Sequence, residues 1–175
     1  MPLFGGSNRP PMDGLTKDEV KRRDALNPEV IKRAGSEIGT VGQANAALAI
    51  LREKADVEPR EFLWPLLLGR QYMSMRRYKA AIQAFEDAVR LDENDIRGYY
   101  GAGHAYLQAA EIRRNLGDAA TEDVVPLDMT VDNLHQEALR NVRKAQTMAD
   151  KKERNELGQL ASTIEHAVSR KAGRL

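Results

Sequence analysis

The sequence predicts an all-α protein, and three observations support this fold class. Apolar residues recur at intervals of three and four along most of the chain, as at Ala81, Phe85 and Ala88, which is the spacing of one face of an α-helix. No stretch alternates apolar and polar residues between turn signals, as half-buried strands do. Helix-start signals recur, and the first is the capping-box spacing of Thr16 and Glu19.

The composition is that of a globular protein. The chain has 175 residues, 42% hydrophobic and 30% charged, and its net charge is +1. This balance predicts no general attraction to nucleic acid or to membranes. The absence of cysteine excludes disulfides, thiol catalysis and thiolate metal sites. No apolar run approaches the roughly 18 residues of a membrane helix, and the N-terminus does not read as a signal peptide, so we expect no membrane span and a cytoplasmic location.

The N-terminal region is expected to contain an arm followed by a helix. Residues 1–14 are rich in Pro and Gly and predict a flexible arm. The alternative is a tether that docks Leu3 and Phe4 on a partner or on the chain's own groove. A first helix is predicted from the Thr16 capping box to about Leu26. Residues 15–175 are then expected to form one helical domain.

Small residues recur at a fixed interval within the helical region. Gly35, Gly69 and Gly103 stand 34 residues apart. Tyr72 follows Gly69, and Tyr106 follows Gly103, in both cases three residues later. This pattern resembles the tetratricopeptide repeat (TPR), a helix-turn-helix unit of about 34 residues. The alternative is an irregular helical bundle with accidental spacing. The resemblance implies a right-handed superhelix of about three repeats, with an N-terminal helix and a C-terminal capping helix.

The repeat register divides the chain into units. The predicted units are residues 28–61, 62–95 and 96–149, and the third carries an insertion at about 111–134. We expect its first helix to end near Gly117 and its second to start between residues 130 and 132. A capping helix is predicted over about 151–171. The positions expected to pack the two helices of each unit together are Gly35, Gly69, Tyr72, Ala81, Phe85, Ala88, Gly103, Tyr106, Ala138 and Ala145.

No catalytic or metal-binding motif is evident. The histidines His104, His135 and His166 are far apart in the sequence and form no HExxH motif or close pair. The glycine-rich stretch 98–104 lacks the preceding strand of a phosphate-binding loop. The carboxylates of the insertion do not have the spacing of a calcium loop. We therefore expect no enzymatic activity, cofactor or metal.

The TPR resemblance points to a concave groove lined by the first helix of each unit, in which such domains bind an extended peptide or a helix. The candidate groove residues are Lys32, Leu63, Leu66, Arg70, Met73, Arg97, Tyr100 and His104. The cations could pair with acidic side chains of a ligand. The TPR subclass that clamps the C-terminal carboxylate of chaperones uses two asparagines, where this chain has Ser36 and Leu67. Recognition of chaperone tails is therefore not expected.

Two functions follow as hypotheses. The first is a scaffold or adaptor that binds a peptide or helix of a partner protein in the groove. The alternative is a structural or assembly subunit that contacts partners through the insertion and the N-terminal arm. The N-terminal arm or helix could instead cover the groove, or the groove could be a self-associating face. Few aromatic residues in the groove argue against RNA binding, and three repeats make a monomer feasible.

Overall fold

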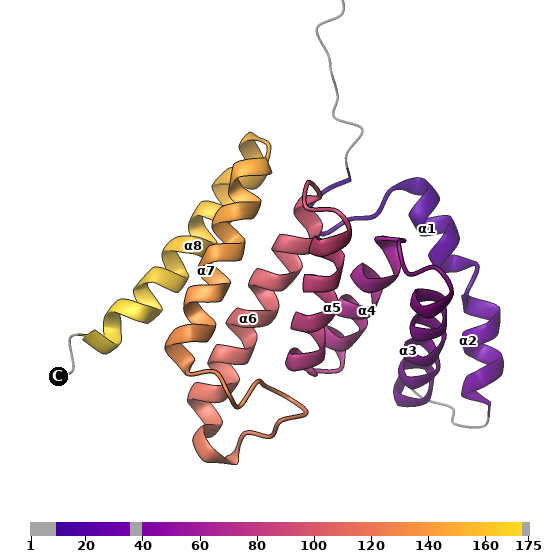
Figure 1. The fold of residues 1–175 in the computed structure, drawn as a ribbon, viewed down its shortest axis with the longest axis horizontal. Helices are drawn as coiled ribbons and strands as arrows, with labels where there is room; N and C mark the ends of the chain where they lie inside the picture. Colours follow the sequence, from indigo (N-terminus) through magenta and orange to yellow (C-terminus); the bar gives the residue numbers. More distant parts are fainter. Residues whose placement is uncertain (1–9, 36–39, 173–175) are drawn as a thin grey trace, which may run out of the picture.

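The structure, a computed structural model, describes residues 10–35 and 40–172 and is all-α over these residues. Figure 1 shows the helices side by side in chain order, from α2 at one end to α8 at the other. The elements are α1 (Lys17–Asp24), α2 (Asn27–Ala34), α3 (Thr40–Val57), α4 (Leu63–Ser74), α5 (Tyr78–Leu91), α6 (Ile96–Leu116), the 3₁₀ turn η1 (Gly117–Ala119), α7 (Val131–Met148) and α8 (Lys151–Ala172). The predicted right-handed twist of the stack stays a prediction.

Helix starts follow the local sequence signals. The Thr16 hydroxyl accepts a hydrogen bond from the Glu19 N–H, and the Glu19 carboxylate accepts one from the Thr16 N–H, so the predicted capping box is confirmed. The Asp95 side chain caps α6 and the Thr130 hydroxyl caps α7. Each side chain satisfies a backbone N–H that has no partner within its own helix.

Close approach of helices explains two of the three periodic glycines. A Cβ added at Gly69 on α4 would lie 2.7 Å from the ring of Phe85 on α5. A Cβ added at Gly103 on α6 would lie 2.8 Å from Cγ2 of Val142 on α7. Gly101 on α6 approaches the same ring atoms of Phe85 as Gly69 does. The ring is therefore held between α4 and α6, which fixes the spacing of these helices.

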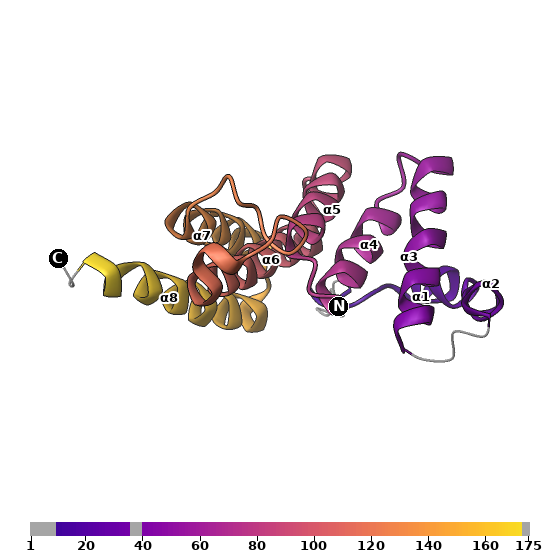
Figure 2. The same cartoon turned by 90° about the horizontal axis from the view of Figure 1, so that it is seen from below.

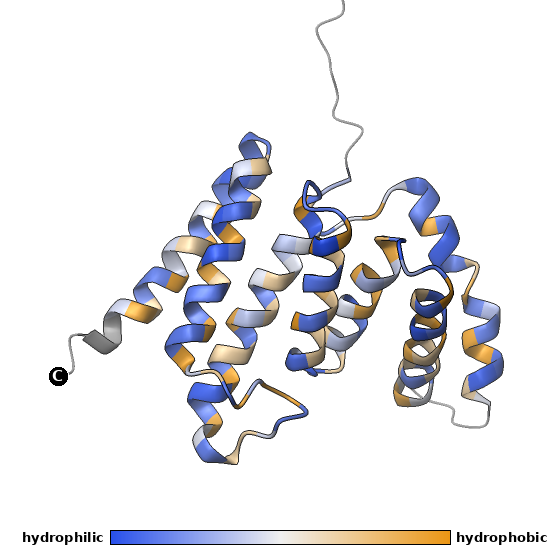
Figure 3. Ribbon diagram, viewed as in Figure 1, coloured by the Kyte–Doolittle hydropathy of each residue, from blue (hydrophilic) through white to orange (hydrophobic). Residues whose placement is uncertain are grey.

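One core runs from α3 to α8 and includes Met12 of the N-terminal segment. Figure 3 shows apolar and polar residues alternating around the helices, and the apolar faces meet between neighbouring helices. The predicted packing residues other than the glycines are all buried, namely Tyr72, Ala81, Phe85, Ala88, Tyr106, Ala138 and Ala145. Leu157 and Ile164 of α8 are fully buried, so α8 covers the end of this core in the region where a capping helix was expected.

The first predicted unit differs from the expected pattern. Gly35 was expected to pack two helices together, and this prediction is wrong. Gly35 ends α2 at φ +55°, and among the residues that the structure describes only the Arg33 carbonyl oxygen lies within reach of an added Cβ, at 4.0 Å. Glycine is used here for a backbone conformation that other residues rarely adopt. As a result α2 has only 8 residues, whereas α3 has 18. Ile38, which stands at the position that Tyr72 and Tyr106 occupy in the other units, lies outside the described residues.

The insertion lengthens α6 and then packs back onto the chain. The last residue of α6, Leu116, and the first residue of α7, Val131, lie where the spacing predicts them. Figures 1 and 2 show the connecting loop on the side of α5. The Lys79 N–H of α5 donates to the Val124 carbonyl at 3.1 Å, and the side chain of Val125 is fully buried. The loop is therefore part of the packed structure.

Candidate functional site

The N-terminal segment, residues 10–26, crosses the predicted groove. Figures 1 and 2 show its first part running from α6 past α4 to α1. The Met12 N–H donates to Glu153 Oε1 of α8 at 3.1 Å, and the Gly14 carbonyl accepts from Arg70 Nη2 of α4 at 2.9 Å. The Met12 side chain is only 7% exposed. The part of the predicted flexible arm that the structure describes thus contacts α4 and α8, whereas Leu3 and Phe4 lie outside the described residues.

Arg97 is not available to a ligand in this arrangement, which corrects the prediction that it lines an open groove. Its side chain is 4% exposed and forms a bidentate pair with Glu19, with N–O distances of 2.6 and 3.0 Å. A second pair joins it to Asp95 at 2.6 Å. Burial raises the pKa of the Glu19 carboxyl and the bonds from Arg97 lower it, and the net shift is downward. The positive charge of Arg97 is therefore balanced by carboxylates of the same chain.

The prediction that Leu63 and Leu66 line an open groove is also corrected, because both side chains are fully buried in the core. The other predicted groove residues are more accessible. Lys32 is exposed on α2, and Met73, Tyr100 and His104 are half-buried. The rings of Tyr100 and His104, one turn apart on α6, meet edge to face with centroids 4.6 Å apart. Burial lowers the pKa of the His104 imidazole.

A cavity of about 340 Å³ remains open beside the N-terminal segment, between α2, α3 and α4. Its walls are mostly apolar and its charged groups are two arginines. The lining residues are Leu15, Arg23, Leu26, Asn27, Val30, Ala47, Leu51, Leu67, Arg70, Gln71 and Ser74. Of the predicted groove residues only Arg70 lines it. A cavity of this kind can take an apolar side chain and bind an anionic group at its rim.

Arg70 is the chemically distinctive group of the cavity. It is half-buried, and burial, followed by the nearby charge of Arg97, lowers the pKa of its guanidinium. Its one hydrogen bond within the described residues goes to a neutral carbonyl, that of Gly14. Arg23, at the same cavity, is already paired with Asp24 at 2.7 Å. A ligand carboxylate would therefore be stabilised most at Arg70, which has no anionic partner in the described part of the chain.

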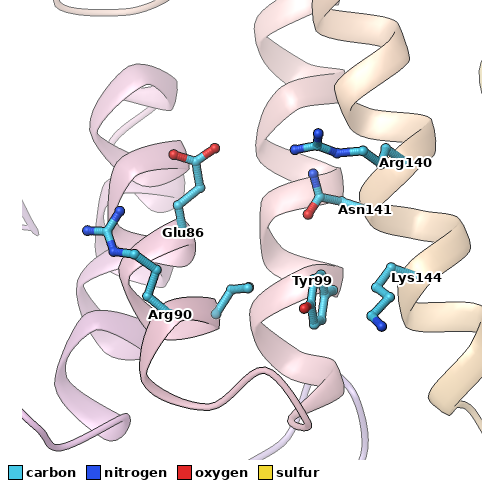
Figure 4. Close-up of a pocket in the computed structure, with 7 residues that line it drawn as sticks. Glu86, Arg90, Tyr99, Arg140, Asn141 and Lys144 are labelled. Atoms are coloured by element: carbon cyan, nitrogen blue, oxygen red, sulfur yellow. The ribbon is translucent and has the colours of Figure 1, made fainter.

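A second cleft lies between α5, α6 and α7 (Figure 4) and has a volume of about 500 Å³. Figure 4 shows Glu86 and Arg90 on one side, Arg140, Asn141 and Lys144 on the other, and Tyr99 between them. Sequence reasoning missed this cleft because its residues come from three helices. The insertion separates α7 from α5 and α6 in the sequence, so no repeat spacing connects these residues.

The charges of this second cleft are largely balanced within the chain. Glu86 accepts a hydrogen bond from the Tyr106 hydroxyl at 2.6 Å, Arg90 pairs with Asp87, and Arg140 pairs with Glu137 at 2.7 Å. The Lys144 ammonium lies 5.9 Å from the centre of the Tyr99 ring. The cleft is therefore a weaker candidate than the cavity at Arg70.

The acidic insertion forms no metal centre in the described residues. No group of three or more His, Asp or Glu side chains there is placed to hold an ion. Glu122 is paired with Lys79 of α5. The exposed acids that remain for a partner are Asp118, Asp123 and Asp128.

Comparison with known proteins supports the repeat. The family model described as "TPR repeat" matches residues 69–110, which span the second half of α4, all of α5 and most of α6. No curated protein and no solved structure matches the chain. None of the described helices is long and apolar enough to cross a membrane.

Proposed function

Because residues 69–110 form a TPR repeat, and such repeats are typical of protein–protein interaction modules, we propose that this chain is a non-enzymatic scaffold or adaptor. It binds a peptide or helix of a partner protein in the cavity between α2, α3 and α4. An apolar side chain of the partner enters between Leu26, Val30, Leu51 and Leu67, and a carboxylate pairs with Arg70.

The observation that supports this proposal most is the state of Arg70. A half-buried guanidinium without a hydrogen-bonded anionic partner is unfavourable, because its hydration is incomplete. The charges of Asp13 and Glu19 nearby oppose this effect, but the net shift of the Arg70 pKa is still downward. The nearby Arg97 increases the cost through like-charge repulsion. A partner carboxylate would remove this penalty, and the apolar walls would add the burial that drives most protein association.

The test is site-specific photo-crosslinking in the native cells. A benzoylphenylalanine at Ser74, which is exposed at the cavity, is expected to capture a partner protein. Arg70→Glu should reduce this capture at least tenfold, because a charge-assisted pair becomes a repulsion. Lys152→Glu, the same charge change at an exposed position of α8, serves as the matched control and should leave capture unchanged. Equal capture by the Arg70→Glu chain would remove this cavity as the binding site.

A further inference from the structure

The helix α1 of the N-terminal segment is held mainly by polar contacts, whereas Met12 before it is buried in the core and Leu15 and Leu26 at its two sides pack against the core. None of the residues of α1 is buried. Arg22 pairs with Glu58 and Glu61, each at 2.8 Å, and its guanidinium lies 4.8 Å above the ring of Trp64. Polar contacts at partly exposed positions contribute little net stability, because water competes for the same groups. Segments with few buried apolar contacts open at low free-energy cost.

The surface beneath the segment is built differently, since it is apolar and rigid. Trp64 is 2% exposed, and Leu63 and Leu66 next to it are fully buried. The Arg97 guanidinium lies 5.0 Å from the centre of the Phe62 ring. These residues belong to α4 and α6 or directly precede them, and both helices are fixed by the packing around Phe85. Opening of the segment would leave a preformed binding surface.

The segment contacts this surface in the way that a bound peptide would. In chain order it presents a buried apolar side chain at Met12, a backbone carbonyl at Gly14 for Arg70, and a carboxylate at Glu19 for Arg97. The carboxylate is bound in a bidentate manner, which is the most specific way in which an arginine recognises one. These three contacts describe the chemistry that the surface of α4 and α6 accepts.

We propose that residues 10–26 are an exchangeable occupant of the groove. This proposal rests on the proposed function, and it extends the binding surface from the cavity to α4 and α6. A partner segment with an apolar side chain, a free carbonyl and a carboxylate in this order displaces the N-terminal segment. Leu15, Arg23 and Leu26 form one wall of the cavity, so the displacement also opens the cavity and leaves both Arg70 and Arg97 to the partner.

Competition explains why such a partner must contact the cavity as well. The tethered segment competes at an effective concentration on the order of millimolar. A partner that only copied the segment would have to exceed this concentration. A partner that also pairs with Arg70 through a carboxylate gains a direct contact that the segment does not provide, because the hydrogen bond from Arg70 to the described part of the segment goes to the neutral Gly14 carbonyl.

The experiment uses the full chain and a fluorescein-labelled peptide of residues 10–26 as the probe. Glu19→Gln weakens the tethered competitor and keeps a side-chain oxygen for the helix cap. Asp18→Asn serves as the matched control. Asp18 is the other carboxylate of the same turn, and the pair with Arg97 is made by Glu19. We expect the probe to bind the Glu19→Gln chain roughly tenfold more tightly than the unchanged chain, because the tethered pair with Arg97 is lost. Asp18→Asn should leave the affinity within about twofold.

The single tryptophan provides a second readout. Trp64 lies against Arg22 of α1 and its indole N–H donates to Glu58 at 3.0 Å. Release of the segment should shift its emission to longer wavelength in the Glu19→Gln chain, and saturation with probe should reverse the shift. Equal probe affinity for the two chains, or no binding to either, would overturn the proposal.

Hydrogen exchange on the unchanged chain avoids any effect of a substitution on folding. The amides of α1 should exchange at least a hundredfold faster than those of α4 and α6, because α1 opens without the core. Equal rates would contradict an exchangeable segment. Failure here leaves the proposed function testable, since capture at Ser74 that depends on Arg70 but not on Glu19 would show a working cavity under a fixed segment.

Discussion

At the scale of single residues, the missing side chains of the repeat glycines set the helix spacing. The Phe85 ring fills the space where Gly69 and Gly101 have no Cβ. The same ring atoms are in close contact with α4 at Gly69 and with α6 at Gly101. A helix interior normally disfavours glycine by about 1 kcal/mol relative to alanine, so this close packing outweighs a local cost.

This packing predicts the effect of Gly69→Ala. An added Cβ 2.7 Å from a ring that is also packed against Gly101 should destabilise the chain by about 1–3 kcal/mol through overpacking, which exceeds the gain in helix propensity. Gly158→Ala on α8 is the matched control, since its Cβ would meet only the flexible Gln146 amide at 3.2 Å. The control should be neutral or stabilising by up to about 1 kcal/mol. The measurement is the free energy of unfolding in urea, and equal values for the two variants would refute the proposed packing.

At the scale of elements, the insertion between η1 and α7 acts as part of the core. It covers α5 through the Lys79–Val124 backbone hydrogen bond and through the buried Val125 side chain. An element packed in this way offers a partner only its exposed acids. An interaction role for the insertion would therefore depend on charge and would weaken with salt.

Val125→Ala measures how firmly the insertion is packed. The loss of a buried branched side chain should reduce the free energy of unfolding by about 2 kcal/mol, because the loop cannot collapse fully into the space. Val57→Ala, at a position 76% exposed at the end of α3, is the control and should change it by less than about 0.5 kcal/mol. Urea unfolding followed by circular dichroism compares the two. A Val125 variant as stable as the control would mean that the loop is not packed in solution.

At the scale of the whole molecule, stability depends on two histidines in its α6–α7 half. Burial lowers the pKa of His104 and His135, and the nearby Arg114 charge lowers that of His135 further. Arg114 Nη2 lies 3.1 Å from His135 Nε2. A lowered folded-state pKa means that the unfolded chain binds protons more readily, so stability is present above the unfolded pKa and is lost as the pH falls.

The resulting prediction concerns the pH dependence of unfolding. The free energy of unfolding should fall as the pH is lowered from 7 to 5, by at most about 1.4 kcal/mol per pH unit for each histidine. The double variant His104→Gln, His135→Gln should show a flatter dependence in this range, whereas His166→Gln, at an exposed position on α8, should not. Urea unfolding at pH 7, 6 and 5 measures the slope. An unchanged slope in the double variant would contradict the assignment.

The sequence by itself determined the features that depend on neighbouring residues. These include the all-α class, the Thr16 capping box, the end of α6, the start of α7, and the close packing at Gly69 and Gly103. Helix periodicity, caps and repeat spacing are local patterns. Gly35 shows the limit of such patterns, since the same spacing there marks a helix end.

Only the tertiary structure decided which of the predicted groove residues are buried or paired within the chain. Arg97 pairs with Glu19, which lies 78 residues earlier in the chain. Gly14 contacts Arg70 of α4 across 56 residues of sequence, and Met12 contacts Glu153 of α8 across 141. No periodicity encodes contacts of this kind. They arise because a short segment folds across a surface that distant helices assemble, and this arrangement leaves Arg70 half-buried without an anionic partner at hydrogen-bond distance in the described part of the chain.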